Sequence, residues 1–221
     1  MPVRPLALAL AGLLLGLPAV SGCASQAPAA TGPVADVSMP ADTDGLNGVV
    51  LPRPYRVPVT RLVDTTGAPL DLATDARKPL TLVFFGYTNC PDICQAVMAG
   101  IASALVRLDA GQRAQVDVVF VTTDPARDDE ETLRAYLDRF DPSFTGATGR
   151  LDRIVRVASA LAVPIEKGRR LASGGYDVTH GTQVLGLLPG GRAPFVWPES
   201  TDPAALADDI TTILDDKVPG L

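Results

Sequence analysis

Basic runs, internal repeats and long apolar stretches are all missing from this sequence of 221 residues. Lysine and arginine are scattered, and the net charge is −6, which argues against a general affinity for nucleic acid. The apolar stretch at residues 6–17 is shorter than a membrane-spanning helix needs. Histidine and cysteine are rare, with one and three residues, so each of them needs its own explanation. The length allows one well-packed core with an additional tail.

Residues 1–22 have the three parts of a secretory signal peptide. Arg4 gives a thin basic start, residues 6–17 are apolar, and small residues lead into Val-Ser-Gly-Cys at 20–23. That tetrapeptide resembles a bacterial lipobox, whose cysteine becomes the lipidated first residue of the mature protein. We therefore expect a lipid anchor on Cys23. Several acyl chains on one residue would give stable membrane attachment. The alternative is an ordinary signal peptide with a cysteine there by chance.

The segment that follows Cys23 has the composition of a linker. Residues 24–51 are rich in Ala, Pro, Gly, Ser, Thr and Asp and show no apolar period. We expect residues 23–51 to be a disordered tether that holds a domain at 52–221 off the extracytoplasmic face of the bacterial membrane. The alternative for its last part, residues 46–51, is packing on the domain.

Lipidation of Cys23 would leave Cys90 and Cys94 as a lone close pair. One short loop stabilises an exported domain of this size very little, so the pair indicates chemistry rather than a structural staple. Residues 80–86 read as a buried strand, and Pro91 is suited to the first turn of a helix that starts near Cys90. Two cysteines four apart would then share a face at a helix N-terminus, where thiolate is favoured. The pattern therefore predicts disulfide exchange, metal binding or both.

Residues 80–122 predict a right-handed βαβ unit in an α/β fold. Apolar residues at helical spacing follow Pro91 and end before Gly111, and residues 116–122 read as a second buried parallel strand. The other expected elements are an edge strand at 55–63 with a hairpin partner at 70–72, a helix at 129–140, a turn at 144–149, a helix at 151–161 packed through Ile154, Val155 and Ala158, a β-hairpin at 185–197, and a helix at 202–216.

Three segments, taken in order, resemble the SCO/SenC family of copper proteins. They are Gly-Tyr-Thr-Asn-Cys-Pro-Asp-Ile-Cys at 86–94, Thr-Asp-Pro-Ala-Arg-Asp at 123–128 and Tyr-Asp-Val-Thr-His at 176–180. The resemblance implies a thioredoxin-like fold, with a central mixed sheet flanked by helices, an N-terminal β-hairpin and an inserted hairpin. It also implies copper ligands at Cys90, Cys94 and His180, and a metallochaperone role toward the dinuclear copper centre of cytochrome c oxidase. Without the resemblance, a lone histidine would more often be a surface or half-buried loop residue.

Two positions depart from the family pattern. Gln95 stands where the family has proline, and Thr179 stands where it has aspartate next to the histidine. An aspartate at that position would hydrogen-bond the imidazole or bias its protonation. We therefore expect altered redox or copper-transfer behaviour without it, with Asp177 or Asp124 as candidate substitutes. From the residues alone, Asp124 and Arg127 are expected to cap a helix and form an ion pair. Tyr87 and Phe85 are expected to be core or rim residues rather than ligands.

The donor chemistry agrees with copper. Thiolates suit Cu(I) and a neutral imidazole suits Cu(I) or Cu(II), whereas a closed structural zinc site needs four ligands. A site with three donors leaves room for a ligand from a partner, which the resemblance identifies as cytochrome c oxidase subunit II. Oxidation to a disulfide would switch the site off, so a thiol reductase is expected as a partner, together with a copper donor.

Two enzymatic alternatives remain open. A thiol-disulfide oxidoreductase that keeps the cysteines of an exported partner reduced would need Cys90 and Cys94 but not His180. A peroxidase would need one peroxidatic cysteine with a supporting Thr and Arg, and the paired spacing speaks against it.

Overall fold

A mixed sheet of eight strands forms the centre of the computed structural model, which describes residues 45–170 and 176–218. The strand order is β1-β10-β9-β4-β5-β6-β2-β3. Neighbours β4, β5 and β6 run parallel, and the other pairs are antiparallel. The strands are β1 (Val49–Arg56), β2 (Leu62–Asp64), β3 (Pro69–Leu70), β4 (Leu80–Gly86), β5 (Val116–Thr122), β6 (Thr145–Thr148), β9 (Val184–Leu188) and β10 (Arg192–Trp197).

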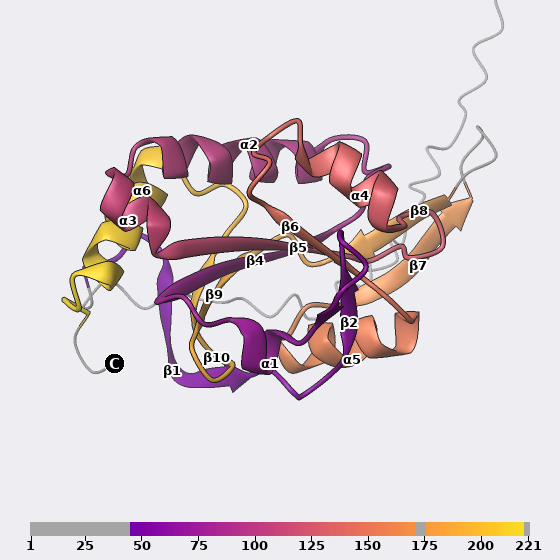
Figure 1. The fold of residues 1–221 in the computed structure, drawn as a ribbon, viewed down its shortest axis with the longest axis horizontal. Helices are drawn as coiled ribbons and strands as arrows, with labels where there is room; N and C mark the ends of the chain where they lie inside the picture. Colours follow the sequence, from indigo (N-terminus) through magenta and orange to yellow (C-terminus); the bar gives the residue numbers. More distant parts are fainter. Residues whose placement is uncertain (1–44, 171–175, 219–221) are drawn as a thin grey trace, which may run out of the picture. The chain divides into compact units, whose positions relative to one another are not determined.

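Helices cover both faces of this sheet. Figure 1 shows α2 and α4 on one side of the sheet and α1 and α5 on the other. Neighbouring residues of β4 point to opposite faces, so Phe84 belongs to the core under α2 and Phe85 to the core over α5. The helices are α1 (Leu72–Asp75), α2 (Ile93–Val106), α3 (Ala110–Ala114), α4 (Glu130–Leu137), α5 (Leu151–Ala160) and α6 (Pro203–Leu214).

The predicted βαβ unit is present with the predicted strand bounds. Every residue of β4 is buried, and its parallel pairing with β5 runs from Leu80–Val116 to Gly86–Thr122. A strand covered on both faces carries a continuous apolar run, and this run made both strands recognisable in the sequence. The hairpin of β2 and β3 and the hairpin of β9 and β10 are also present. The predicted edge strand at 55–63 was wrong as one element, because β1 ends at Arg56, residues 57–61 form no strand and β2 begins at Leu62. The fold is therefore the predicted mixed α/β sheet flanked by helices.

The packed domain begins earlier than residue 52. Leu46 is buried and β1 starts at Val49, inside the predicted tether. The buried carboxylate of Asp209 on α6 accepts hydrogen bonds from the backbone N–H groups of Asn47 and Gly48, both at 2.8 Å. These bonds hold the incoming chain on the domain. The predicted signal peptide, Cys23 and most of the predicted tether lie outside the described residues.

Two further local predictions were wrong. The predicted turn at 144–149 contains the strand β6. At Gly146 in this strand a Cβ would lie 2.6 Å from the Thr65 side chain and 3.1 Å from Leu133, so only glycine fits there. Glycine there serves close packing rather than a turn. On α5 the buried residues are Ile154, Val157 and Ala158, whereas Val155 is exposed.

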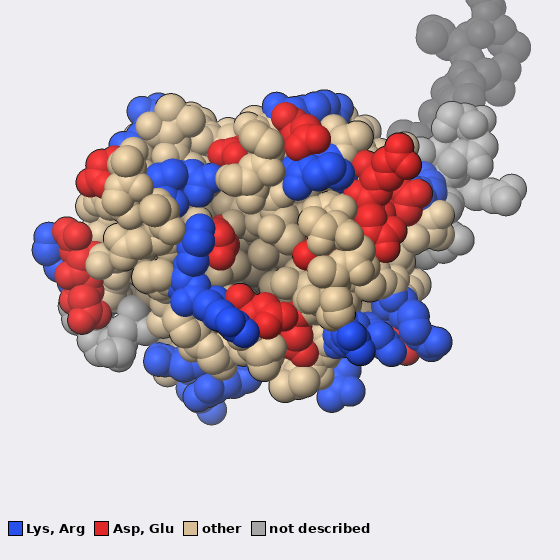
Figure 2. Space-filling view, viewed as in Figure 1, with Lys and Arg blue, Asp and Glu red and all other residues tan. Residues whose placement is uncertain are grey.

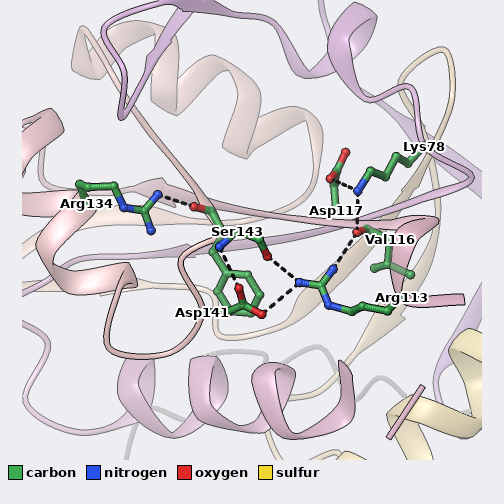
Figure 3. Close-up of polar contacts among 8 residues, drawn as sticks. Lys78, Arg113, Val116, Asp117, Arg134, Asp141 and Ser143 are labelled. Carbon is green, nitrogen blue, oxygen red and sulfur yellow. Dashed lines mark hydrogen bonds and ion pairs between the residues drawn. The ribbon is translucent and has the colours of Figure 1, made fainter. Parts of the chain in front are cut away.

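Polar contacts hold the amino ends of the central strands. Figure 3 shows Arg113, which donates to the carbonyl oxygen of Val116 at 3.2 Å and to Asp141 at 3.1 Å. Lys78 forms an ion pair with Asp117 at 2.8 Å.

Because β4 and β5 are parallel, their carboxyl ends meet at the opposite edge. Open α/β sheets bind ligands at that carboxyl edge, where the loop with Cys90 and Cys94 begins.

Charge is spread rather than concentrated on the face in Figure 2, where basic and acidic side chains of the described residues lie interspersed. Within residues 45–170 and 176–218, each helix is too short or too polar to cross a lipid bilayer.

Candidate metal centre

The cysteine loop connects the carboxyl end of β4 to α2. The helix starts at Ile93 with Asp92 as its N-cap, so the predicted start near Cys90 was too early and Pro91 lies before the cap. Cys90 sits in a turn in which its backbone N–H donates to the Tyr87 carbonyl oxygen at 3.1 Å. The Asp92 side chain makes no capping hydrogen bond, and the Cys94 N–H donates instead to Cys90 Sγ at 3.4 Å. A sulfur therefore takes the place of the usual capping oxygen.

His180 reaches the cysteine loop from a separate hairpin. It is the last residue of β8 (Tyr176–His180), which pairs with β7 (Ile165–Arg170) in a sheet of two strands. This hairpin is the predicted insertion. The imidazole Nδ1 lies 2.8 Å from the Gly181 carbonyl oxygen, which can only accept, so Nδ1 carries the proton. In the neutral ring, Nε2 then has the free lone pair and can bind a metal.

The structure brings the three predicted donors together. The sulfurs of Cys90 and Cys94 and a ring nitrogen of His180 all lie within 4.8 Å of one another. The imidazole Nε2 lies 3.4 Å from Cys94 Sγ. Within the described residues, this is the one such group of three or more histidine, cysteine or carboxylate side chains. The three donors therefore need little rearrangement to share one small ion.

The group is buried on one side and open on the other. Cys94 is fully buried and Cys90 is 5% exposed, while His180 is half-buried. Cys90 and His180 line a hollow of about 300 Å³ together with Tyr87, Pro91, Asp92, Ile93, Val178, Thr179 and Thr182. A donor group that opens into a hollow gives a second molecule access to the same ion.

The two thiols have very different acidities. The Cys94 thiol donates a hydrogen bond that lowers the pKa of Cys90 to about 4, against the effect of burial. The same hydrogen bond, together with burial, raises the pKa of Cys94 far above its ordinary value. The reduced pair therefore holds one thiolate and one thiol at neutral pH. Binding of a metal by both sulfurs must release the proton of Cys94.

Aromatic side chains frame the imidazole. The Tyr87 ring meets the His180 ring edge-on at 5.8 Å between centroids, and Phe84 does so at 6.2 Å. Tyr87 therefore lies at the rim of the site. Phe85 belongs to the core on the other face of the sheet.

The segment at 123–128 lies beside the cysteine loop. Asp124 forms the predicted ion pair with Arg127, whereas the cap of α4 is Asp129. Arg127 places its guanidinium 5.7 Å from the centre of the Tyr87 ring. Asp128 is fully buried and binds the cysteine loop, a role that its place among helix-start residues did not indicate.

The two departures from the family pattern can also be located. Thr179 is exposed and lines the hollow beside His180. Gln95 is exposed in the first turn of α2, where its N–H donates to the Asp92 carbonyl oxygen. Of the candidate substitutes for the missing aspartate, Asp124 is paired with Arg127, and the Asp177 side chain lies outside what the structure describes.

Comparisons with known proteins agree with this geometry. The family model described as SCO1/SenC matches residues 59–215. A protein of Stutzerimonas stutzeri described as copper-binding is 32% identical over 148 residues, which are 67% of this chain and 72% of that protein. The human mitochondrial protein named SCO2 homolog is 28% identical over 137 residues, 62% of this chain and 52% of that protein. The chain therefore spans about half the length of this mitochondrial relative.

Solved structures give the same result. Copper-bound Sco1 of yeast superposes with a TM-score of 0.68 at 26% identity, covering 76% of this chain and 92% of that one. Copper-bound ScoI of Bradyrhizobium japonicum gives 0.64 at 27% identity, with 72% and 99% covered. Because the family model matches most of the chain and includes all three segments, this chain belongs to the SCO1/SenC family of copper-binding proteins with a thioredoxin-like fold.

Proposed function

We propose that this protein is a copper metallochaperone that carries copper on Cys90, Cys94 and His180 and delivers it to the dinuclear copper centre of cytochrome c oxidase subunit II. The observation that carries the proposal is the group of three donor atoms within 4.8 Å of one another at the edge of a hollow. Two sulfurs and one nitrogen form a low-coordinate set suited to Cu(I), and the imidazole also suits Cu(II).

Delivery requires that the ion can leave. The hollow beside Cys90 and His180 gives a ligand of the recipient room to approach the ion. Oxidation of Cys90 and Cys94 to a disulfide would remove both sulfur donors, so the cycle includes a thiol reductase as well as a copper donor. In this cycle copper is the cargo.

We further propose that the domain works at the extracytoplasmic face of the bacterial membrane. The support is in the sequence, where residues 1–22 resemble a signal peptide that ends in a lipobox at Cys23. Substitution Cys23→Ala should move the protein from the membrane fraction to the soluble fraction of cells and abolish labelling by a fatty-acid analogue. Membrane association that persists in this variant would contradict the lipid anchor.

Copper binding is tested on the purified, reduced full-length chain. We expect one Cu(I) per chain in a competition titration, and X-ray absorption that shows two sulfurs and one nitrogen around the metal. Substitution His180→Ala should lower the affinity for Cu(I). The absence of sulfur from the first coordination shell would refute the site, and unchanged affinity in His180→Ala would remove histidine from it.

A thiol-disulfide oxidoreductase is the second candidate, favoured by the lowered pKa of Cys90, which keeps a nucleophilic thiolate at neutral pH. This function needs the cysteine pair but no imidazole. Exchange with a disulfide-bonded peptide is the assay. Strong exchange that survives His180→Ala, together with weak copper binding by the unaltered protein, would favour the oxidoreductase.

A further inference from the structure

We propose that Asp128 is a positioning residue of the metal centre, where its buried carboxylate holds the cysteine loop so that Cys90 Sγ stays beside Cys94 Sγ and the imidazole. This inference rests on the proposed copper function of Cys90, Cys94 and His180. Asp128 acts through Thr88, which precedes Cys90 by two residues. Its two carboxylate oxygens already accept hydrogen bonds and the residue is 0% exposed, so it is not itself a copper ligand.

The carboxylate accepts two hydrogen bonds from Thr88. Asp128 Oδ1 accepts from Thr88 Oγ1 at 2.6 Å, and Oδ2 accepts from the Thr88 backbone N–H at 3.0 Å. Two bonds to one residue fix both its position and its orientation. The next turn, in which Cys90 N–H donates to the Tyr87 carbonyl oxygen, carries this restraint to the first sulfur.

The other side of Asp128 is attached to the sheet. Oδ2 also accepts from Thr122 Oγ1 at 2.6 Å, at the last residue of β5. The Asp128 carbonyl oxygen accepts from Thr148 Oγ1 at 2.9 Å, at the last residue of β6. Two central strands therefore hold the carboxylate in place, and the carboxylate holds the loop. Cys94 is fixed separately by its burial in the core.

The same segment also supports the neighbour of the imidazole. Arg127 precedes Asp128 and lies over the Tyr87 ring, whose edge contacts the His180 ring. The segment at 123–128 thus contacts the sulfur loop through one residue and the rim of the histidine site through the adjacent one. A structural role limited to helix capping would need neither contact.

A carboxylate suits this position for a chemical reason. Three donors converge on Asp128, and a carboxylate accepts through both oxygens. Asparagine has the same shape but no charge and one accepting oxygen, so in Asp128→Asn the Thr88 hydroxyl must accept from an NH₂ group, and the charge-assisted bonds to the loop become weaker neutral ones. The loop would then lose part of its restraint. Loss of a partner that orients a metal ligand costs about 10–100-fold in metal affinity.

The chain contains a matched control in Asp209, which is 1% exposed. Its carboxylate accepts from the N–H and side chain of Asn47, from the Gly48 N–H and from Trp197 Nε1, at 2.7 to 2.8 Å. None of these donors belongs to the cysteine loop or the histidine hairpin. Asp209→Asn therefore perturbs a buried carboxylate of the same kind without touching the site.

The experiment compares Cu(I) affinity, copper–thiolate absorption and the alkylation rate of Cys90 in the reduced full-length chain. For Asp128→Asn we expect an affinity loss of about tenfold or more, a changed absorption spectrum and alkylation at least about threefold faster, because a loosened loop opens more often. For Asp209→Asn we expect a lower melting temperature with affinity and spectrum unchanged. A folded Asp128→Asn protein with all three readouts unchanged overturns the proposal. So does an equal affinity loss in Asp209→Asn.

A second pair of variants decides the matter if Asp128→Asn does not fold. Thr88→Val removes only the bond from the hydroxyl and should lower copper affinity, while Thr88→Ser restores it. Unchanged affinity in Thr88→Val then overturns the proposal. If the unaltered protein binds no copper through sulfur, the proposed function fails instead. In that case the alkylation rate in the apoprotein still tests the inference, since faster alkylation supports it and an unchanged rate overturns it.

Discussion

The two segments that supply the proposed metal ligands are held in different ways. The cysteine loop leaves a fully buried strand and is bound by Asp128, and its second sulfur lies in the core. His180 ends a hairpin that forms its own two-stranded sheet, and it is oriented by one hydrogen bond to Gly181 and by ring edges. The sulfurs are thus part of the domain's core, whereas the imidazole is brought to them from outside it. We expect the sulfurs to determine whether copper binds and the imidazole to determine how readily it leaves.

The largest expected effect separates the two segments. Cys94→Ser should abolish stoichiometric Cu(I) binding, because it removes one of two sulfur donors from a set of three donors. His180→Ala should lower the affinity by at least about 100-fold, or about 2.7 kcal/mol, while the two sulfurs still bind. Competition titration with a Cu(I) chelator measures both. Equal losses of affinity in the two variants would contradict the expectation that the sulfurs determine whether copper binds.

The acidity of Cys90 should depend on its neighbour in the loop. With a pKa of about 4, Cys90 is mostly thiolate at pH 5 and above, and its alkylation should slow only as the pH falls through that value. Cys94→Ala removes the hydrogen bond that is the main cause of the lowered pKa, so the midpoint should rise toward the ordinary value. The pH dependence of iodoacetamide labelling measures this shift. An unchanged midpoint would show that the Cys94 thiol does not stabilise the thiolate.

Packing behind the sulfurs should affect stability more moderately. A Cβ at Gly86 would lie 2.9 Å from Phe120, 3.0 Å from Phe84 and 3.1 Å from Cys94 Sγ. Gly86→Ala should therefore lower the free energy of unfolding by about 1–3 kcal/mol, measured by urea denaturation of the reduced protein.

Gly100 in α2 is the matched control for that substitution, since a Cβ there meets nothing within 4 Å. Gly100→Ala should stabilise the protein by about 0.5–1 kcal/mol, because alanine is the better helix former. Equal effects of the two substitutions would mean that the backbone at Gly86 is not tightly packed against the sulfur.

The smallest expected effect concerns the residue before the histidine. Thr179→Asp restores the residue that the family usually has and adds a negative charge beside the imidazole. The charge favours the protonated ring, so copper should be released at a slightly higher pH, by less than about one pH unit because the position is exposed. A pH titration of the copper-bound protein measures the release. A shift to lower pH would contradict this electrostatic account.

Much of the fold could be predicted because its signals are local. The apolar runs of β4 and β5 identify both strands, and the segments 86–94 and 176–180 identify the family and the candidate ligands. Gly146 misled the prediction of β6, because a glycine required for close packing looks the same in a sequence as a glycine in a turn. Asp128 lies in the recognised segment 123–128, but its burial and its contact with the cysteine loop gave no signal, since buried and exposed aspartates cannot be told apart by their neighbours in the chain.

The sequence by itself determined the central strand, the cysteine pair and the helix that follows, because each depends on residues a few positions apart. Only the tertiary structure decided that the imidazole meets Cys94, which is 86 positions away, and that Asp128 joins the cysteine loop to two strands. The physical reason is that a metal centre depends on the distances between a few atoms. Those distances result from the packing of the whole sheet and its inserted hairpin.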